Sequence, residues 1–299
     1  MPTAGDRFVA GGGSVAWSGG QAPPQAPVPD GATDCHFHIY DARQPVAPEA
    51  VLRHGDASVD DYRALQRRLG TSRGVLVQPS TYGTDNHLHL AALQDFGTER
   101  FRMVAVVEPD VADAELRRLH AAGVRGVRFN LTQPGPLALG DLEPMARRLA
   151  ERGWHCQLNM RPDQVVAAER MLLRLPCRIV FDHLGRIRDP KAADADAFAA
   201  IRRLLDHGKA WMKLSGIYLV SREGPPGYAD AGAVAAAFAT AAPERLLWGS
   251  DWPHPTQSAD RKPDDARLLD LLADWVANDD VRRGILVNNP AEVYGFPSG

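Results

Sequence analysis

Residues 101–131, FRMVAVVEPDVADAELRRLHAAGVRGVRFNL, contain one complete strand–helix–strand unit. A short apolar run rich in valine stands at each end of the segment, and each run has the length of a buried strand. Between them, DAELRRLHAAG at 113–123 has helical period and ends on Gly123, where a left-handed cap favours glycine. Strands joined through a helix pair in parallel, so this segment predicts a βαβ unit.

The same alternation recurs along the chain from Thr33 onward. Helical segments separate the apolar runs, and the one at 58–70 opens on a capping signal formed by Ser58 and Asp61. Eight units of this kind over about 270 residues predict an α/β fold, a TIM-type (β/α)8 barrel, ahead of a doubly wound open sheet. No G-x-G-x-x-G follows the first run, which weakens the second fold. The eight runs lie at 32–40, 72–80, 101–109, 123–131, 154–160, 177–185, 210–217 and 245–253.

Residues 1–31 are predicted to form an extended arm ahead of the barrel. They contain Gly-Gly-Gly at 11–13 and prolines at 23, 24, 27 and 29, so they cannot sustain a helix or an interior strand. The remaining residues, 32–299, are predicted to form one barrel domain, since barrels of this length often fold as a single unit.

Composition excludes several kinds of partner. A net charge of −3 with both signs interspersed provides no basic stripe for nucleic acid. No apolar run reaches the roughly 18 residues that a membrane span needs, and the N-terminus has no targeting pattern, so a cytoplasmic location is the default expectation. The three cysteines have no C-x-x-C spacing and are predicted to be reduced thiols. The oligomeric state stays open.

The predicted strands end in polar residues, which is where the active sites of TIM barrels lie. In the first run Asp34, His36 and His38 are two residues apart, so strict alternation predicts that all three point into the barrel mouth. We therefore expect the functional site at this end of the barrel. The polar residues that end the other runs are Gln78, Ser80, Arg128, Asn130, Gln157, Asn159, Asp182, His183, Lys213, Ser215, Ser250, Asp251 and His254.

Some of these residues have more than one interpretation. Burying several titratable groups on different strands is costly, which favours a catalytic role for His36, His38, His183 and Asp251. Arg128 either binds a substrate anion or forms a structural ion pair, because an arginine inside a barrel needs an anionic partner. The remaining histidines are predicted to lie at the surface, including His87, His89 and His155.

The pattern resembles the amidohydrolase superfamily. Its members share a strand-one H-x-H, a strand-six histidine and a strand-eight aspartate, which match His36, His38, His183 and Asp251. The segments RGVRFN, FDHLGR, WGSDWPHP and NNPAEVYGF resemble the amidohydrolase 2 branch, which contains 2-pyrone-4,6-dicarboxylate lactonase, sulfomuconolactonase and D-galactarolactone isomerase. The resemblance extends from about Thr33 to Phe296.

Departures from the metal-dependent members imply an enzyme without a metal cofactor. Those members usually add a lysine or glutamate on strand four and a histidine on strand five. The matching ends here carry Arg128 with Asn130 and Gln157 with Asn159, and a guanidinium has no lone pair to give a cation.

Adventitious metal remains an alternative. Two histidines and a carboxylate would still hold zinc with open positions, and that set would be His36, His38 and Asp251. A zinc-dependent hydrolase or decarboxylase of the same branch therefore stays open.

The resemblance implies hydrolysis or isomerisation of a small carboxylated lactone. Asp251 is the expected base, and the three histidines are expected to polarise the carbonyl and carry a proton to the leaving alkoxide. Arg128 suits a bidentate grip on the substrate carboxylate. The other predicted substrate contacts are Ser80, Gln78, Asn159, His254 and Tyr218.

Amide side chains at the strand ends favour a hydroxyl-rich substrate, because each hydroxyl both donates and accepts a hydrogen bond. An aldarate lactone of the galactarolactone type, from carbohydrate acid metabolism, is therefore the expected substrate. A hydrolase of 2-pyrone-4,6-dicarboxylate or of a muconolactone is the alternative. Outside enzymes, the alternative is a barrel that only binds a small carboxylate.

Overall fold

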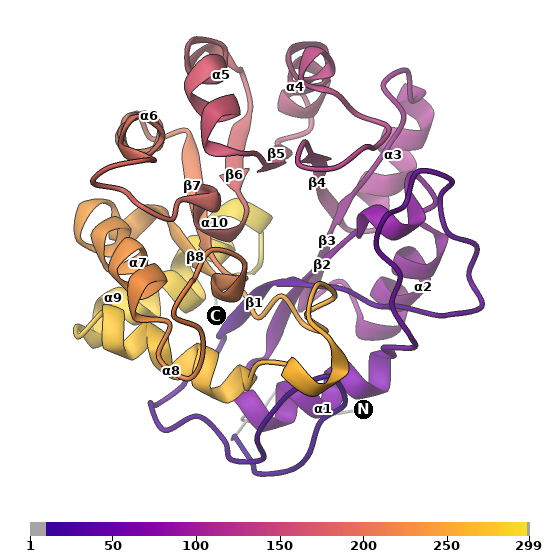
Figure 1. Ribbon diagram of the computed structural model, residues 1–299. Coiled ribbons are helices and arrows are strands. Elements are labelled where there is room, and N and C mark those ends of the chain that lie inside the picture. The colour runs from indigo at the N-terminus through magenta and orange to yellow at the C-terminus, as the bar shows by residue number, and fades with distance from the viewer. Residues whose placement is uncertain (1–9, 298–299) are drawn as a thin grey trace.

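Eight parallel strands form a single sheet, in the order β1 to β8, in the computed structural model, which describes residues 10–297 (Figure 1). Each predicted run contains one of these strands, so the TIM-barrel prediction is confirmed. The strands are β1 (Thr33–Phe37), β2 (Arg73–Val77), β3 (Phe101–Ala105), β4 (Val124–Asn130), β5 (His155–Asn159), β6 (Arg178–Phe181), β7 (Ala210–Leu214) and β8 (Leu246–Trp248).

Helices form an outer ring around the strands (Figure 1). The predicted cap of α1 is present, since Ser58 Oγ accepts from the Asp61 N–H at 3.2 Å and Asp61 accepts from the Ser58 N–H at 2.9 Å. No helix among residues 10–297 is long and apolar enough to cross a membrane. A π-helical turn, Gly284–Asn288, precedes the last helix. The α-helices are α1 (Val59–Leu69), α2 (His87–Phe96), α3 (Asp113–Ala121), α4 (Leu142–Ala150), α5 (Pro162–Arg174), α6 (Ala195–Asp206), α7 (Ala229–Ala241), α8 (Asp265–Trp275), α9 (Asp279–Arg283) and α10 (Asn289–Tyr294).

The barrel closes where β1 meets the segment that follows β8. The His38 N–H donates to the carbonyl oxygen of Trp252 at 2.9 Å, and the Asp251 N–H donates to the carbonyl oxygen of His36 at 2.8 Å. Gly249 permits this approach, because a Cβ there would lie 2.8 Å from the Cβ of His36. Closure therefore places the backbones of His36, His38 and Asp251 side by side.

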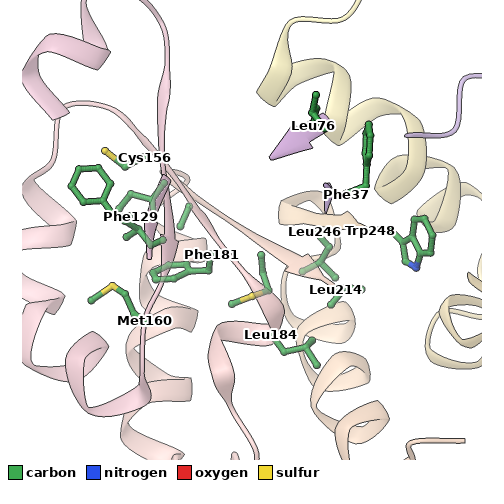
Figure 2. Packing of buried hydrophobic residues seen from close by; sticks show 14 of the residues in the cluster. Phe37, Leu76, Phe129, Cys156, Met160, Phe181, Leu184, Leu214, Leu246 and Trp248 are labelled. Atoms are coloured by element: carbon green, nitrogen blue, oxygen red, sulfur yellow. The ribbon is translucent and has the colours of Figure 1, made fainter. Parts of the chain in front are cut away.

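The main apolar core lies between the strands and the outer helices. Figure 2 shows Phe129, Cys156 and Phe181, contributed by β4, β5 and β6, close together in this core. A smaller cluster includes Val104 and Val180, which alternate with the residues of the main core along β3 and β6. Because neighbouring side chains of a strand point to opposite faces, this second cluster fills the barrel interior.

Asp34 does not point into the barrel mouth, so the alternation predicted for the first run was wrong at this residue. Its carboxylate accepts hydrogen bonds from Tyr62 Oη of α1 at 3.1 Å and from Ser250 Oγ at 2.6 Å. Phe37 stacks on the same Tyr62 ring, with 3.5 Å between the ring centroids. The pairing of β1 with β2 shifts between Asp34 and Phe37, and a bulge of this kind breaks the period of two. Asp34 thus joins β1 to the β8 loop.

The arm runs along the barrel without forming a helix in its described part, residues 10–31. Trp252 Nε1 donates to the carbonyl oxygen of Ala16 at 2.8 Å. Arg68 of α1 donates to the carbonyl oxygens of Gly19 and Gly20, each at 3.0 Å. The arm therefore contacts the loop that closes the barrel. Residues 1–9 of the predicted arm and 298–299 of the predicted barrel domain lie outside the described residues.

Two histidines predicted at the surface are buried. His89 of α2 is 0% exposed and His155 of β5 is 1% exposed, whereas His87 is exposed as predicted. The His155 ring fills the space beside Gly126, where a Cβ would lie 2.5 Å from it. Neither of its ring nitrogens has a hydrogen-bond partner within residues 10–297. Burial is the main cause that lowers the pKa of His155 to about 3.

We expect this buried neutral histidine to make the fold less stable in acid. The unfolded chain, with a histidine pKa of 6.5, binds one more proton than the folded chain between that pH and the folded pKa of about 3. The free energy of unfolding should therefore fall by up to about 1.4 kcal/mol per pH unit across this window. In urea unfolding at pH 7, 6 and 5, His155→Phe should show a shallower fall than the wild type.

His87→Gln is the matched control for this measurement, because His87 is exposed and its replacement should leave the wild-type slope unchanged. Equal slopes for the wild type and His155→Phe would show that His155 does not carry the effect.

Candidate active site

His36, His38 and Asp251 form a buried cluster at the C-terminal end of the strands. Asp251 Oδ1 lies 3.6 Å from His36 Nε2 and 3.6 Å from His38 Nε2. His183, which follows β6, joins them with its ring centroid 4.7 Å from that of His36. The structure thus brings together the four residues predicted to be catalytic, while their roles stay predictions.

Left-handed backbone is concentrated around this cluster. The φ angles are 52° at His183, 60° at Arg186, 62° at Asp251 and 56° at His254. Such conformations cost non-glycine residues of order 1–3 kcal/mol each, and they gather at functional sites. Gly216 allows the close packing, since a Cβ there would lie 2.6 Å from His183 Nδ1 and 3.1 Å from Asp251 Oδ2.

A hydrogen-bonded chain holds the second oxygen of Asp251. Tyr218 Oη donates to Asp251 Oδ2 at 2.5 Å. His254 Nδ1 lies 3.2 Å from Tyr218 Oη, and His254 Nε2 lies 3.1 Å from Asp265 Oδ2. Because the single phenol hydrogen goes to Asp251, the phenol oxygen accepts from His254. Both ring nitrogens of His254 are therefore occupied, which places this predicted substrate contact behind Tyr218.

The cluster combines an ionised carboxylate with neutral imidazoles at His36 and His183. Burial would raise the pKa of Asp251, but its interactions with His183, His38 and His36 outweigh burial and hold that pKa below its usual range. Burial is the main cause that lowers the pKa of His36 well below 6.5 and the pKa of His183 to about 4. Asp251 is thus able to accept a proton at neutral pH.

His38 has a defined tautomer. Its Nδ1 lies 2.7 Å from the carbonyl oxygen of Val77, and a carbonyl oxygen only accepts hydrogen bonds. Nδ1 therefore carries a hydrogen, and Nε2 is the nitrogen on the side of Asp251.

A second polar layer lies next to His36. His36 Nδ1 is 3.2 Å from Asp182 Oδ1 and 3.3 Å from Lys213 Nζ, and Lys213 Nζ donates to Gln157 Oε1 at 2.7 Å. Burial lowers the pKa of Lys213 to about 8, although Asp182 acts in the opposite direction. The sequence marked these residues as polar strand ends but assigned no role to Lys213 or Asp182.

Arg128 forms the structural ion pair that was one of its two predicted roles. Its Nε donates to Asp182 Oδ2 at 3.1 Å, and its Nη1 donates to the carbonyl oxygen of Gln78 at 3.3 Å. Burial would raise the pKa of Asp182, but His36, Arg128 and Lys213 outweigh it and hold that pKa well below its usual range. Arg128 also lines a small pocket, so its predicted grip on substrate stays a prediction.

The rim of the site is a network of amides and hydroxyls. Asn130 Nδ2 donates to Ser80 Oγ at 2.7 Å, and Asn159 Nδ2 donates to Asn130 Oδ1 at 3.0 Å. Arg186, which the sequence reasoning missed, donates from Nε to Asn159 Oδ1 at 3.0 Å and lines an open cavity of about 840 Å³. Its signal in the sequence was its position three residues after His183, in the same strand-end loop.

Gln78 is turned toward its own loop. Its Nε2 donates to the carbonyl oxygens of Gly83 at 3.2 Å and Asp85 at 2.8 Å. Both amide hydrogens are thereby used, and only Oε1 remains for the predicted contact with substrate.

The cluster offers a set of ligand atoms for a divalent cation, and the surroundings of His36 contain one feature that opposes it. His36, His38 and Asp251 present atoms within 4.8 Å of one another, which is the set predicted for a bound metal. A metal-bound histidine donates its other ring N–H to an acceptor. Two groups compete for His36 Nδ1 here. The Asp182 carboxylate, which accepts, lies at 3.2 Å, and the Lys213 ammonium, which has only hydrogens to donate, lies at 3.3 Å.

Comparison with known proteins relates this site to a family. The family model described as amidohydrolase matches residues 33–296. The chain is 34% identical to 2-pyrone-4,6-dicarboxylate hydrolase of Comamonas testosteroni, over 94% of this chain and 96% of the relative. It is 35% identical to 4-sulfomuconolactone hydrolase of Rhizobium radiobacter, over 92% of this chain and 93% of the relative. It is 31% identical to D-galactarolactone isomerase of Agrobacterium fabrum, over 92% of this chain and 94% of the relative.

We expect Arg128→Met to destabilise the fold, because it removes one partner of a buried ion pair. The expected loss is about 3 kcal/mol in the free energy of unfolding, at the low end for such a change because Lys213 still faces Asp182 at 3.7 Å. Urea unfolding at pH 7 measures it.

Arg43→Met is the matched control, since Arg43 pairs with Asp41 while its side chain is 90% exposed. Loss of this exposed pair should cost far less than loss of the buried one, because water and salt screen it. If Arg128→Met costs no more than Arg43→Met, the Arg128–Asp182 pair does not stabilise the barrel.

Proposed function

The chain belongs to the amidohydrolase family of enzymes, and we propose that it hydrolyses or isomerises a carboxylated lactone without a bound metal ion. The observation that carries this proposal is the placement of an ionised Asp251, whose Oδ1 lies 3.6 Å from Nε2 of both His36 and His38. A carboxylate base beside neutral imidazoles provides what acyl transfer needs, namely a proton acceptor next to hydrogen-bond donors.

Asp251 is the general base in this proposal. Tyr218 holds its Oδ2 at 2.5 Å, so Oδ1 is the oxygen that accepts the proton. A water molecule or a substrate hydroxyl placed between Asp251 Oδ1 and His38 Nε2 would give its proton to the carboxylate. The oxygen would then attack the carbonyl carbon of the lactone.

Donors from the histidines stabilise the charge that develops on the carbonyl oxygen. His36 and His183 are neutral at pH 7 and each has one ring N–H, and a donor aimed at a developing oxyanion is usually the largest single contribution to catalysis. When the tetrahedral intermediate collapses, the ring C–O bond breaks and the leaving alkoxide takes the proton held by Asp251. With water as the nucleophile, the product is the open hydroxy acid.

Isomerisation uses the same groups. When a hydroxyl of the substrate replaces water, one C–O bond forms and another breaks, no water is consumed, and the product is a lactone of different ring closure. The relatives include both hydrolases and an isomerase, so the pose of the attacking hydroxyl, rather than the base, would decide the outcome.

The rim supports an aldarate lactone as the substrate. Such a molecule carries one free carboxylate and several hydroxyls. The guanidinium of Arg186 lines the open cavity and suits the carboxylate. The amides of Asn130 and Asn159, together with Ser80, suit the hydroxyls because they both donate and accept.

An NMR screen tests the reaction and the substrate class together. Purified protein is incubated with aldarolactones, 2-pyrone-4,6-dicarboxylate and a muconolactone in the presence of a chelator. We expect an aldarolactone to be converted, with signals of a free acid for hydrolysis or of a shifted lactone for isomerisation. Activity that disappears with chelator and returns with zinc would overturn the metal-free proposal, and inert lactones throughout would overturn the reaction class.

Asp251→Asn should lower kcat roughly 10²- to 10⁴-fold, because the amide cannot accept the proton, while KM changes little. Steady-state kinetics on the converted lactone measures both constants. Asp206→Asn is the matched control, since the same change at an exposed residue at the end of α6 should leave kcat unchanged. Wild-type kcat in Asp251→Asn would remove Asp251 from the role of base.

A further inference from the structure

Lys213 is a fully buried cation in the barrel interior that the proposed reaction does not use. It lies on β7 with 0% of its surface exposed. Its ammonium contacts Gln157 Oε1 at 2.7 Å, His36 Nδ1 at 3.3 Å and Asp182 Oδ1 at 3.7 Å. An ammonium has three hydrogens to donate and no lone pair, so Gln157 Oε1 and His36 Nδ1 take two of them, while Asp182 Oδ1 lies beyond hydrogen-bond distance and faces the positive charge.

The contact with His36 determines which ring nitrogen carries the hydrogen. Because Lys213 only donates, Nδ1 of His36 must be the acceptor and its hydrogen must lie on Nε2. The opposite tautomer would direct Nδ1–H toward Asp182 Oδ1 at 3.2 Å. Asp182 and Lys213 therefore compete for Nδ1, and of these two contacts the one with Lys213 has the geometry of a hydrogen bond.

The far side of the His36 ring agrees with this assignment. Nε2 faces Asp251 Oδ1 at 3.6 Å, and an ionised carboxylate attracts an N–H and repels a lone pair. His38 differs at its other nitrogen, because its Nδ1 carries a hydrogen and lies 2.7 Å from the carbonyl oxygen of Val77.

We propose that Lys213 is a positioning residue that fixes His36 as an Nε2–H donor and thereby opposes binding of a divalent cation between His36, His38 and Asp251. A cation at this place needs the lone pair of His36 Nε2. The ring hydrogen must then lie on Nδ1, where it points toward the hydrogens of the Lys213 ammonium. The positive charge of Lys213 adds repulsion across the ring. The benefit of the donor for lactone chemistry rests on the proposed function, whereas the tautomer and the opposition to metal do not.

Nitrogen NMR of the wild type is the first test, and it requires neither a variant nor a substrate. In metal-free, ¹⁵N-labelled protein at pH 7, long-range ¹H–¹⁵N correlations distinguish a protonated from an unprotonated ring nitrogen. His36→Gln identifies the His36 signals by their loss. We expect His36 to have an unprotonated Nδ1 and a protonated Nε2. A protonated Nδ1 on neutral His36 would overturn the proposal.

Zinc affinity of Lys213→Met is the second test. The methionine side chain has a similar length and no charge, so His36 is expected to turn its Nδ1 hydrogen toward Asp182 and the affinity for zinc to rise roughly 10- to 100-fold. Titration with zinc alone against a chromophoric chelator measures this change in the absence of a lactone. A purely structural lysine would alter stability without changing the tautomer or the zinc affinity.

Lys209→Met is the matched control, because Lys209 precedes the same strand and its Nζ donates to the carbonyl oxygen of Leu175 at 3.2 Å, away from His36. It should keep the wild-type tautomer and zinc affinity. Unchanged tautomer and zinc affinity in folded Lys213→Met would overturn the proposal. If the tautomer and the zinc affinity behave as expected but the protein converts no lactone, the inference about Lys213 is supported and only the proposed function is overturned.

Discussion

Closure of the barrel between β1 and the segment after β8 is the constraint on which the rest of the structure depends. Two backbone hydrogen bonds, from the N–H groups of Asp251 and His38, join these segments at 2.8 and 2.9 Å. The same residues carry the side chains of the candidate site, so the sheet cannot close without bringing base and imidazoles together. Asp34 reinforces the junction from the outside, since it accepts from the N–H groups of both His36 and Ser250. Fold and site are therefore stabilised by one set of contacts.

Interior charges connect the candidate site to the middle of the barrel. Asp182 has three neighbours in the ion-pair network, namely Arg128, Lys213 and His36. Isolated charges at this depth would be very costly, and mutual pairing is what makes them tolerable. A polar layer arranged in this way has few alternative hydrogen-bond patterns, so it orients the imidazole above it. The rigidity that the chemistry needs then comes from electrostatics as well as from packing.

Much of the fold followed from periodicity, because apolar runs and helical segments alternate with little ambiguity. The grouping of His36, His38, His183 and Asp251 also followed, since strand ends of a barrel meet at one edge. The alternation failed at Asp34, where a bulge that has no signature in the residues shifts the register. It also gave no hint that His155 fills the space left by Gly126. The contact between Lys213 and His36 depends on residues 177 positions apart, and only the closed barrel brings them together.

The left-handed backbone at His183, Asp251 and His254 has a consequence for how the site tolerates change. Histidine, aspartate and asparagine enter this conformation more readily than most residues, whereas β-branched side chains meet a steric barrier. In saturation mutagenesis of these positions, the conformational free energy of each new residue would therefore affect the result before the chemistry of its side chain does. An inactive valine variant at Asp251 would report a displaced loop, while an asparagine variant would report the missing charge. The backbone at these positions therefore favours a few residue types that share a conformational preference rather than a reactivity.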